Sequence, residues 1–284
     1  MTLITDGGST KCDWVLLDSN GEIVFKTKTL GLNPAVIQRE ELISRISANE
    51  TLQEVFSKVN NVDFYGAGCG TATPNAILKE VLQGLFNNAQ VNVSEDLAAA
   101  VFSVTTEPGI VCILGTGSNS CYFDGKEIHA PIPSLGYMLM DEAGGNYFGK
   151  RMIRDYYYKR MPAEIASNFE KKYDLEADTI KKHLYKEPNP GAYLASFAQI
   201  IFEQKDFPPY YHSLLKEGIT DFIVSRILTF ENASSLPIHF IGSIAYFSKE
   251  VISECLKENN LKLGNVIQRP IDGLIEYYRK KLLD

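Results

Sequence analysis

Clustered cysteine is absent from this sequence. Its five cysteines stand far apart and form no Cys-x-x-Cys pair: they are Cys12, Cys69, Cys112, Cys121 and Cys255. This spacing argues against a structural zinc site and a disulfide framework, and it favours a reducing cytoplasm. Cys12, Cys112 and Cys121 fall in apolar runs, where we expect small buried side chains. The four histidines also lack metal-ligand spacing.

Long apolar runs and positive charge are scarce as well. No apolar stretch reaches the roughly 18 residues of a membrane helix, and the first expected strand begins almost at Met1. We therefore expect neither a membrane partner nor a secretory leader. A net charge of −7 and a pI of about 5.3 argue against nucleic acid as a partner. A nucleotide stays open, because it needs only a local cluster of donors.

The common nucleotide-binding signatures are also missing. The chain contains no Gly-x-x-x-x-Gly-Lys-Ser/Thr loop, and no Gly-x-Gly-x-x-Gly lies between a strand and a helix. A Walker-type or dinucleotide-binding fold is therefore not indicated.

The chain does contain one hairpin pattern that occurs two times. In the first copy, apolar residues 3–5 lead into Asp6-Gly-Gly-Ser-Thr-Lys11, and the run 13–17 returns. In the second, the run 109–114 leads into Gly115-Thr-Gly-Ser118, and 121–123 returns. In each copy a second turn follows, at Asn20-Gly21 in the first and at Asp124-Gly125 in the second. Such dipeptides between apolar runs are a strong hairpin signal. Two such copies predict two related half-molecules.

Strands and helices alternate along the rest of the chain, which predicts an α/β architecture. We expect helices over 35–48, 52–59, 74–86, 97–103, 146–160 and 244–259, and strands over 27–32, 62–65, 90–93, 238–241 and 265–267. A linker at 105–109 holds the expected domain boundary, and a long helical insertion follows over about 146–230. Pro270 begins a terminal helix with an apolar face formed by Ile271, Leu274, Ile275 and Tyr278.

The two glycine-rich tips are candidate phosphate sites. Backbone N–H groups of such turns can point into one concavity, since no Cβ blocks the approach. Thr10, Thr116 and Ser118 add hydroxyl donors, and Lys11 adds a charge. Asp6, at a strand end inside such a turn, suits Mg²⁺, which binds one or two carboxylates together with phosphate oxygens. Tight β-turns, and an Asx-turn cap for Asp6, are the simpler alternatives.

Asp96 is a candidate general base. It follows a strand and opens a helix, so it lies at the carboxyl edge of a sheet, where ligand crevices of α/β proteins form. Phosphoryl transfer to a hydroxyl needs a carboxylate that accepts the proton. A helix N-terminus would lower its pKa and keep it ionised. Ser94 and Asp96 are also ordinary N-cap residues, so the pattern alone leaves both readings open.

Two further turns are ambiguous. Asp141 lies in an acidic turn before a helix, Asp141-Glu-Ala-Gly-Gly145. Gly242-Ser243 is a small-residue turn from strand to helix that would either admit a flat base or ribose or let the helix and strand pack closely.

Together these motifs resemble the acetate/sugar kinase–Hsp70–actin superfamily, and within it the group of N-acetylglucosamine kinases and the BadF/BadG/BcrA/BcrD activator ATPases. Asp6–Lys11 resembles the first phosphate motif, Leu114–Asn119 the second, and Phe240–Ser243 the adenosine motif. The remaining matches are Ser94–Ala99 to the segment of the catalytic aspartate, Gly136–Gly144 to a Gly-Asp-Glu-Gly segment, and Leu32-Asn33-Pro34 to a sugar-contacting loop.

The resemblance implies two actin-like, ribonuclease H-like α/β domains around an ATP cleft: residues 1–107 with the terminal helix 271–284 packed back on them, and 108–270. It implies ATP with Mg²⁺ and an amino sugar, most simply N-acetylglucosamine phosphorylated at O6. Asp96 would be the general base and Asp6 the metal residue. Asn33, Gly68, Asp96, Thr116 and Asp141 would bind the sugar. ATP would bind Gly7, Gly8, Ser9, Thr10, Lys11, Gly115, Thr116, Gly117, Ser118, Gly242 and Ser243.

Some segments depart from the family pattern. Met140 replaces a glycine, and Arg269-Pro-Ile-Asp-Gly273 stands where the family has a glycine- and alanine-rich segment, which puts the adenosine contacts there in doubt. An activator ATPase with an iron–sulfur cluster, which needs clustered cysteines, and a sugar-binding protein without turnover are the alternatives. The identity of the acceptor sugar and the oligomeric state, with a homodimer among the alternatives, stay open.

Overall fold

The computed structural model describes residues 1–8, 10–203 and 207–283. The chain divides into two compact units: unit 1 is Met1–Thr106 with Arg269–Asp284, and unit 2 is Glu107–Gln268. Each unit is built on a five-stranded mixed sheet with helices against it. The expected α/β class is thereby confirmed. None of the helices in the described part of the chain is long and apolar enough to cross a membrane.

The sheet of unit 1 has the strand order β3-β2-β1-β4-β5. Its strands are β1 (Thr2–Gly7), β2 (Lys11–Leu17), β3 (Ile23–Leu30), β4 (Asn61–Gly66) and β5 (Gln90–Glu95). β1, β2 and β3 pair antiparallel, whereas β1, β4 and β5 run parallel. Because parallel strands end at the same edge of a sheet, the residues that follow β1, β4 and β5 gather there.

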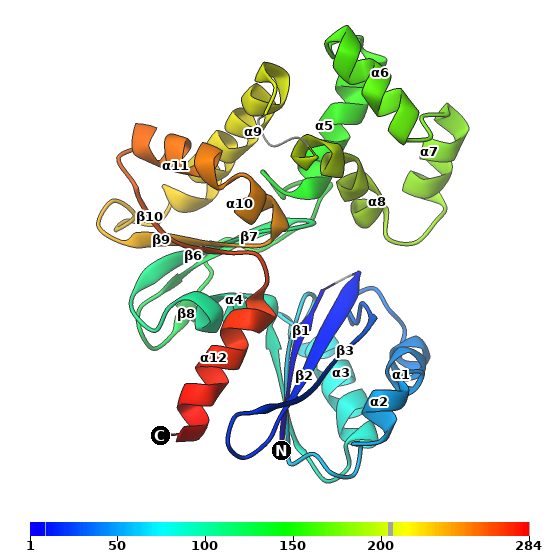
Figure 1. Cartoon of the computed structure of the whole chain (residues 1–284), viewed down its shortest axis with the longest axis vertical. Coiled ribbons are helices and arrows are strands. Elements are labelled where there is room, and N and C mark those ends of the chain that lie inside the picture. The colour runs from blue at the N-terminus through cyan, green and yellow to red at the C-terminus, as the bar shows by residue number, and fades with distance from the viewer. Residues whose placement is uncertain (9, 204–206, 284) are drawn as a thin grey trace. The chain divides into compact units, whose positions relative to one another are not determined.

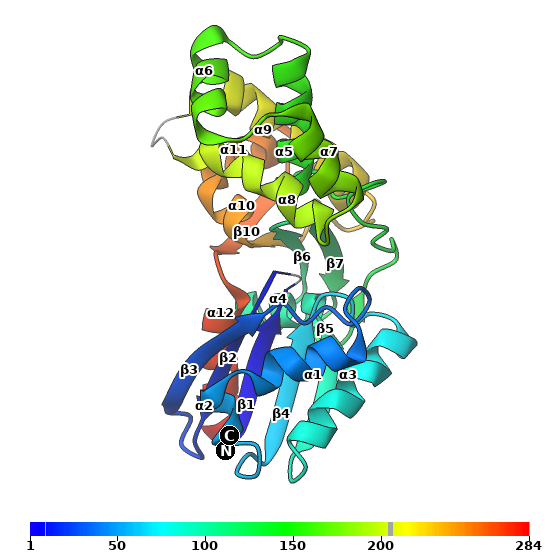
Figure 2. The ribbon, with the colours of Figure 1, turned by 90° about the vertical axis from the view of Figure 1, so that its right-hand side faces the viewer.

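Helices cover both faces of this sheet (Figures 1 and 2). On one face lie α1 (Arg39–Ser47), α2 (Glu50–Gln53) and α3 (Ala72–Leu85), over a core around Trp14 and Phe64. On the other lie α4 (Asp96–Val104) and α12 (Pro270–Leu283). The apolar face expected on the terminal helix is buried there, because Ile271, Leu274, Ile275 and Tyr278 are each at most 3% exposed.

The sheet of unit 2 repeats the pattern, with the order β10-β9-β6-β7-β8. Its strands are β6 (Gly109–Leu114), β7 (Ser118–Phe123), β8 (Ile128–His129), β9 (Pro237–Ile241) and β10 (Lys262–Ile267). Between β8 and β9 lie α5 (Gly145–Tyr157), α6 (Ala163–Lys172), α7 (Ala177–Tyr185), α8 (Pro190–Ser196), η1 (Phe197–Phe202), α9 (Pro209–Phe222) and η2 (Ile223–Ile227). α10 (Ser243–Phe247) and α11 (Lys249–Glu258) follow β9.

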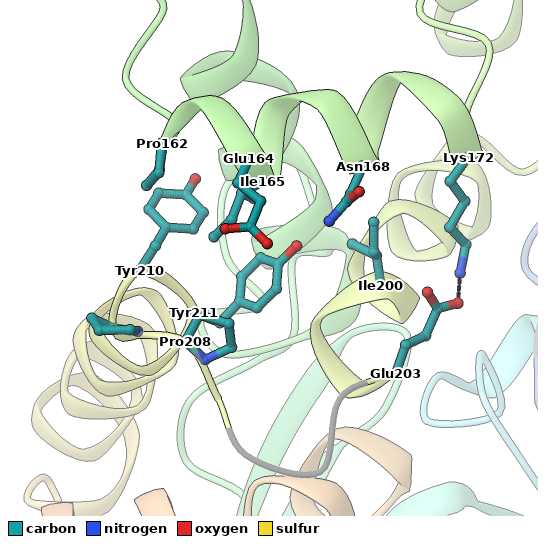
Figure 3. A pocket seen from close by; sticks show the side chains of 11 residues that line it. Pro162, Glu164, Ile165, Asn168, Lys172, Ile200, Glu203, Pro208, Tyr210 and Tyr211 are labelled. Atoms are coloured by element: carbon teal, nitrogen blue, oxygen red, sulfur yellow. Dashed lines mark ion pairs between the residues drawn. The ribbon is translucent and has the colours of Figure 1, made fainter.

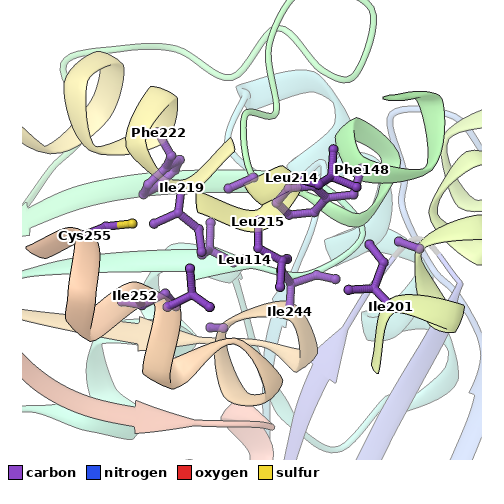
Figure 4. Close-up of a cluster of buried hydrophobic side chains, with 14 of the residues drawn as sticks. Leu114, Phe148, Ile201, Leu214, Leu215, Ile219, Phe222, Ile244, Ile252 and Cys255 are labelled. Atoms are coloured by element: carbon purple, nitrogen blue, oxygen red, sulfur yellow. The ribbon is translucent and has the colours of Figure 1, made fainter. Parts of the chain in front are cut away.

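A single apolar core joins this second sheet to its helices (Figure 4). Leu114 of β6 and Phe148 of α5 pack in it with Leu215 and Ile219 of α9 and Ile252 of α11. Burial of such side chains contributes about 1.5–3 kcal/mol each, so the core fixes the end of β6, where the second glycine-rich tip begins.

Several expected element bounds were wrong. The helix expected from 35 begins at Arg39, because the carbonyl of Asn33 first accepts the N–H groups of Val36 and Ile37 in turns. The helix expected over 52–59 ends at Gln53. The helix expected over 244–259 divides at Ser248, whose buried hydroxyl donates to the Ile244 carbonyl, the same oxygen that accepts the Ser248 N–H.

Other bounds moved less. The strand expected over 27–32 is part of one longer edge strand, β3, that begins at Ile23, and the helix expected over 146–160 ends at Tyr157. The exposed Lys26 and Lys28 on β3 are typical of an edge strand that is protected from further pairing.

Candidate active site

The predicted site residues fall into two groups, one in each unit. Unit 1 holds Asp6, Gly7, Gly8, Thr10, Lys11, Asn33, Gly68 and Asp96, whereas unit 2 holds Gly115, Thr116, Gly117, Ser118, Asp141, Gly242 and Ser243. Ser9, predicted to bind ATP, lies outside the described residues.

Asp6 and Asp96 share one edge of the sheet of unit 1. The register of the parallel strands aligns Asp6 of β1 with Tyr65 of β4 and Ser94 of β5. Asp96 follows β5 as the first residue of α4. The two carboxyl groups are close enough for the charge of Asp6 to raise the pKa of Asp96. Two acids predicted separately from the sequence therefore form one acidic pair.

The electrostatics of Asp96 correct an expectation. A helix N-terminus was expected to lower its pKa, and the N–H groups of Leu97 and of Asp96 itself do act in that direction. Poor hydration outweighs them, and the neighbouring charges of Glu95 and Asp6 add to it, so the pKa of Asp96 rises to about 7. Part of the side-chain surface of Asp96 stays exposed, but the protein atoms packed around it leave little room for water. A carboxyl with a pKa near neutrality suits general-base chemistry.

Asp6 is also poorly hydrated. Burial, followed by the charge of Asp13, raises the pKa of Asp6 to about 6, against the opposing charges of Lys11 and Arg269. In the described part of the chain, the carboxylate of Asp6 forms no hydrogen bond or ion pair. A desolvated carboxylate that no protein cation satisfies fits a Mg²⁺ ion held by one carboxylate and phosphate oxygens. No group of three or more metal-ligating side chains occurs among the described residues.

Two loops of unit 1 meet at Asn33 and Gly68. The Oδ1 atom of Asn33 accepts the N–H of Ala35 at 2.9 Å, and it lies where a Cβ on Gly68 would be. Gly70, on the same loop, is covered by the carboxylate of Glu95, and a Cβ there would lie 2.7 Å from its Oε1. Asn33 thus lies against Gly68, and Glu95, which precedes Asp96 in the chain, lies against Gly70.

Glu95 was missed by the sequence reasoning. Its carboxylate is half-buried, burial raises its pKa, and its charge in turn raises the pKa of Asp96. A signal existed in Gly70, whose missing side chain leaves the space that this carboxylate fills. From the sequence, however, nothing relates positions 70 and 95.

The first glycine-rich tip is held closed by its own backbone. The N–H of Gly8 donates to the Lys11 carbonyl at 2.8 Å, and the N–H of Gly31 to the Thr10 carbonyl at 2.9 Å. Thr10 and Lys11 are exposed. The ammonium of Lys11 lies 3.1 Å from Oδ2 of Asp13, so it carries an ion pair already.

The second tip is locked by the start of α5. The N–H of Gly145 donates to the Gly115 carbonyl at 2.8 Å, and that of Asn146 to the Thr116 carbonyl at 2.9 Å. The side chain of Thr116 stays exposed at the tip. The tip therefore has a defined shape within unit 2.

Asp141 contributes to the same lock. It is 7% exposed and has φ of 72°, and its Oδ1 accepts the N–H of Ser118 at 3.2 Å while Oδ2 accepts Nδ2 of Asn146 at 2.7 Å. Nearby, Oγ of Ser118 and Oδ1 of Asn146 are buried and have no hydrogen-bond partner among the described residues. The carboxylate of Asp141 thus holds the tip in shape. Asn146, which the sequence reasoning did not single out, is its partner.

Gly242 is required by close packing. Its φ is 116°, and a Cβ there would collide with the carbonyl oxygen of Leu114, the last residue of β6. Its N–H donates to the Ile267 carbonyl at 3.0 Å. The turn before α10 therefore lies against the strand that leads into the second tip.

A hollow of about 530 Å³ lies elsewhere in unit 2, among its helices (Figure 3). Pro162, Pro208, Tyr210 and Tyr211 line it, and an ion pair joins Lys172 to Glu203 beside it. No residue predicted to be functional lines this hollow. The candidate chemistry therefore lies at the sheet edges and glycine-rich tips.

Comparisons with known proteins extend over the whole chain. No family model matches it. A candidate N-acetylglucosamine kinase from Porphyromonas gingivalis is 36% identical, over 99% of this chain and 99% of that chain, with a TM-score of 0.91. A candidate N-acetylglucosamine kinase from Chromobacterium violaceum is 15% identical over 97% of this chain and 98% of that chain, with a TM-score of 0.71.

A third solved structure is a glucokinase of the ROK family from Streptomyces griseus in complex with glucose and AMPPNP. It is 14% identical over 97% of each chain, with a TM-score of 0.62. The second and third likenesses show the fold alone. The first is high enough in identity and coverage to show kinship.

Proposed function

This chain belongs to the N-acetylglucosamine kinase family of actin-like sugar kinases, and from that premise we propose that it transfers the γ-phosphoryl group of ATP to a hydroxyl of an amino sugar. N-acetylglucosamine is the proposed acceptor, and its O6 the proposed site of transfer. The observation that carries this proposal is the acidic pair of unit 1. Asp96, with its pKa raised to about 7, lies beside Asp6, whose carboxylate forms no ion pair with any cation of the described residues.

In the proposed reaction, Asp96 accepts the proton of the sugar hydroxyl as that oxygen attacks the γ-phosphorus. The O–P bond to the acceptor forms, the bond to ADP breaks, and Asp96 later returns its proton to solvent. General-base catalysis of this kind contributes roughly 10²- to 10⁴-fold. Since the pKa of Asp96 is about 7 in the free protein, the reactive ionised form becomes dominant only above neutral pH.

The other predicted residues have roles in binding. Asn33, Gly68 and Thr116 would orient the sugar, and the N–H groups of the two tips would bind the phosphates of ATP. Asp6 would hold Mg²⁺, which supplies charge neutralisation on the phosphate oxygens when it is bound. Asp141 is proposed to act on the sugar only indirectly, since its carboxylate already binds Ser118 and Asn146.

The activator-ATPase alternative gains no support from the cysteines. All five are free thiols, and all five are buried. An iron–sulfur cluster shared between subunits needs cysteines gathered at a surface, and buried, scattered thiols do not offer that.

A coupled ADP-release assay with Mg·ATP tests the proposal against a panel of N-acetylglucosamine, glucosamine, N-acetylmuramic acid and neutral hexoses. We expect release stimulated by one N-acetylated amino sugar, and NMR of the product would locate the phosphate. Release that is indifferent to every sugar, or no release at all, would refute the kinase. Iron content would then decide between the activator ATPase and a binding protein.

A further inference from the structure

Asp13 forms ion pairs with three cationic side chains of unit 1. Its side chain is only 5% exposed, and Nζ of Lys11 lies 3.1 Å from its Oδ2. Its Oδ1 lies 3.7 Å from Nζ of Lys28 and 3.3 Å from Nη2 of Arg269. The sheet register explains two of these contacts, because Lys28 of β3 is the cross-strand partner of Asp13 and Lys11 lies two residues before it on the same face. Arg269 comes from the segment that begins α12.

Asp6 lies directly opposite Asp13 in the β1–β2 pair, so both carboxylates are on one face of the sheet. Like charges in such a pair destabilise a sheet unless something compensates. The compensation is unequal. All three cations bind Asp13, whereas the carboxylate of Asp6 forms no ion pair in the described part of the chain.

Arg269 retains capacity for a further acceptor. Its Nε is buried and has no hydrogen-bond partner among the described residues, and it lies 4.0 Å from Oδ2 of Asp272. Its charge is felt at Asp6. Arg269 also stands in the segment that departs from the glycine- and alanine-rich pattern of the family, so the family pattern gives it no role.

We propose that Asp13 is a positioning residue of the nucleotide site: it holds Lys11, Lys28 and Arg269 beside Asp6, where they attract the phosphates of ATP, and it keeps those cations off Asp6. This inference rests on the proposed function. Its physical basis is competition, because a cation released from Asp13 would pair with the desolvated carboxylate of Asp6 and displace the metal from it.

The test is the gain in nucleotide affinity that Mg²⁺ provides, measured by calorimetry as the ratio of the dissociation constants of ADP without and with Mg²⁺. The salt concentration is held constant, because partly exposed pairs are screened. In Asp13→Asn we expect this ratio to fall by up to about fivefold, the scale of one partly screened ion pair. Asp13→Glu keeps the charge and should recover most of the ratio. An unchanged ratio in Asp13→Asn would overturn the inference.

Two further variants separate the parts of the proposal. Glu276→Gln removes a carboxylate of the same helix, α12, that pairs with Arg279 at 2.8 Å, so it should leave the ratio unchanged. Arg269→Gln should weaken ADP binding about fivefold both with and without Mg²⁺, at an unchanged ratio. It serves also if Asp13→Asn does not fold, and normal ADP affinity in Arg269→Gln would contradict the role of the cations. If the unaltered protein bound no ADP, the proposed function itself would fail.

Discussion

Replacing Asp96 with asparagine should lower the catalytic rate and raise the stability of the fold. The amide is nearly isosteric with the carboxyl but cannot accept a proton from the sugar. We expect ATP and sugar still to bind, while kcat falls by roughly 10²-fold or more. The same change removes a charge that the folded protein solvates poorly, so Asp96→Asn should unfold at a higher temperature than the unaltered protein.

The size of this stabilisation follows from the pKa. A rise from 3.8 in the unfolded chain to about 7 in the folded protein corresponds to about 4 kcal/mol of lost stability for the ionised form. The side chain keeps some contact with solvent, which screens the interaction, and about 2 kcal/mol is the expected net gain. For a protein of this size that raises Tm by roughly 4–8 °C.

The stability gained in Asp96→Asn depends on pH. Because the pKa of Asp96 is higher in the folded than in the unfolded state, folding takes up a proton between the two values, and stability falls as pH rises from 3.8 to about 7. Differential scanning fluorimetry at pH 4, 6 and 8 should therefore show little Tm advantage for Asp96→Asn at pH 4, and the full advantage at pH 8. A Tm difference that does not depend on pH would refute the electrostatic reasoning, and normal turnover in the variant would refute the role as a base.

Three other substitutions address the surroundings of the site. Glu95→Gln removes a charge that raises the pKa of Asp96, so the acidic limb of the kcat/KM profile should move to lower pH. Asp141→Ala leaves the N–H of Ser118 without its buried acceptor, which should cost about 1–3 kcal/mol in urea unfolding and raise KM for ATP. Gly242→Ala forces a Cβ into a neighbouring carbonyl at φ of 116°, and should destabilise the protein by roughly 2 kcal/mol or more.

Each of these has a matched control. Gly70→Ala displaces the carboxylate of Glu95 but keeps its charge, so it should alter the KM for the sugar. Asp141→Asn tolerates the left-handed backbone and keeps one acceptor oxygen, so its loss should be smaller than that of the alanine variant. Gly84→Ala meets no neighbouring atom inside a helix and should stabilise by about 0.5–1 kcal/mol. An unshifted pH limb, an unchanged KM for ATP, or a Gly242→Ala protein as stable as the original would contradict the respective argument.

The local elements were largely readable from the sequence. Alternation of apolar residues and the Asn-Gly and Asp-Gly turns predicted both hairpins, and Asp6 and Asp96 were placed at strand ends by that pattern alone. Element ends were less readable. The helix expected from 35 begins at Arg39, after a turn in which Oδ1 of Asn33 accepts the N–H of Ala35. Another expected helix divides at Ser248, whose hydroxyl donates to the Ile244 carbonyl. Such side-chain hydrogen bonds depend on side-chain geometry, which periodicity does not contain.

The environment of the site was not readable. The pKa of Asp96 moves opposite to the helix-dipole expectation, because hydration and the charges of Glu95 and Asp6 depend on what surrounds the carboxyl. Likewise, the role of the acidic turn at Asp141 was ambiguous from the sequence. Its contacts with Ser118 and Asn146 show that the carboxylate holds the second tip in shape.

The sequence by itself determined which residues could do chemistry: its hydrophobic periodicity places glycines and acids at the ends of buried strands, and that is local information. Only the tertiary structure decided which of them act together. Arg269 meets Asp13 across 256 positions of the chain, and Glu95 fills the space above Gly70. Contacts of this kind arise when sheet register and helix packing are set by burial of the whole core, so no local pattern specifies them.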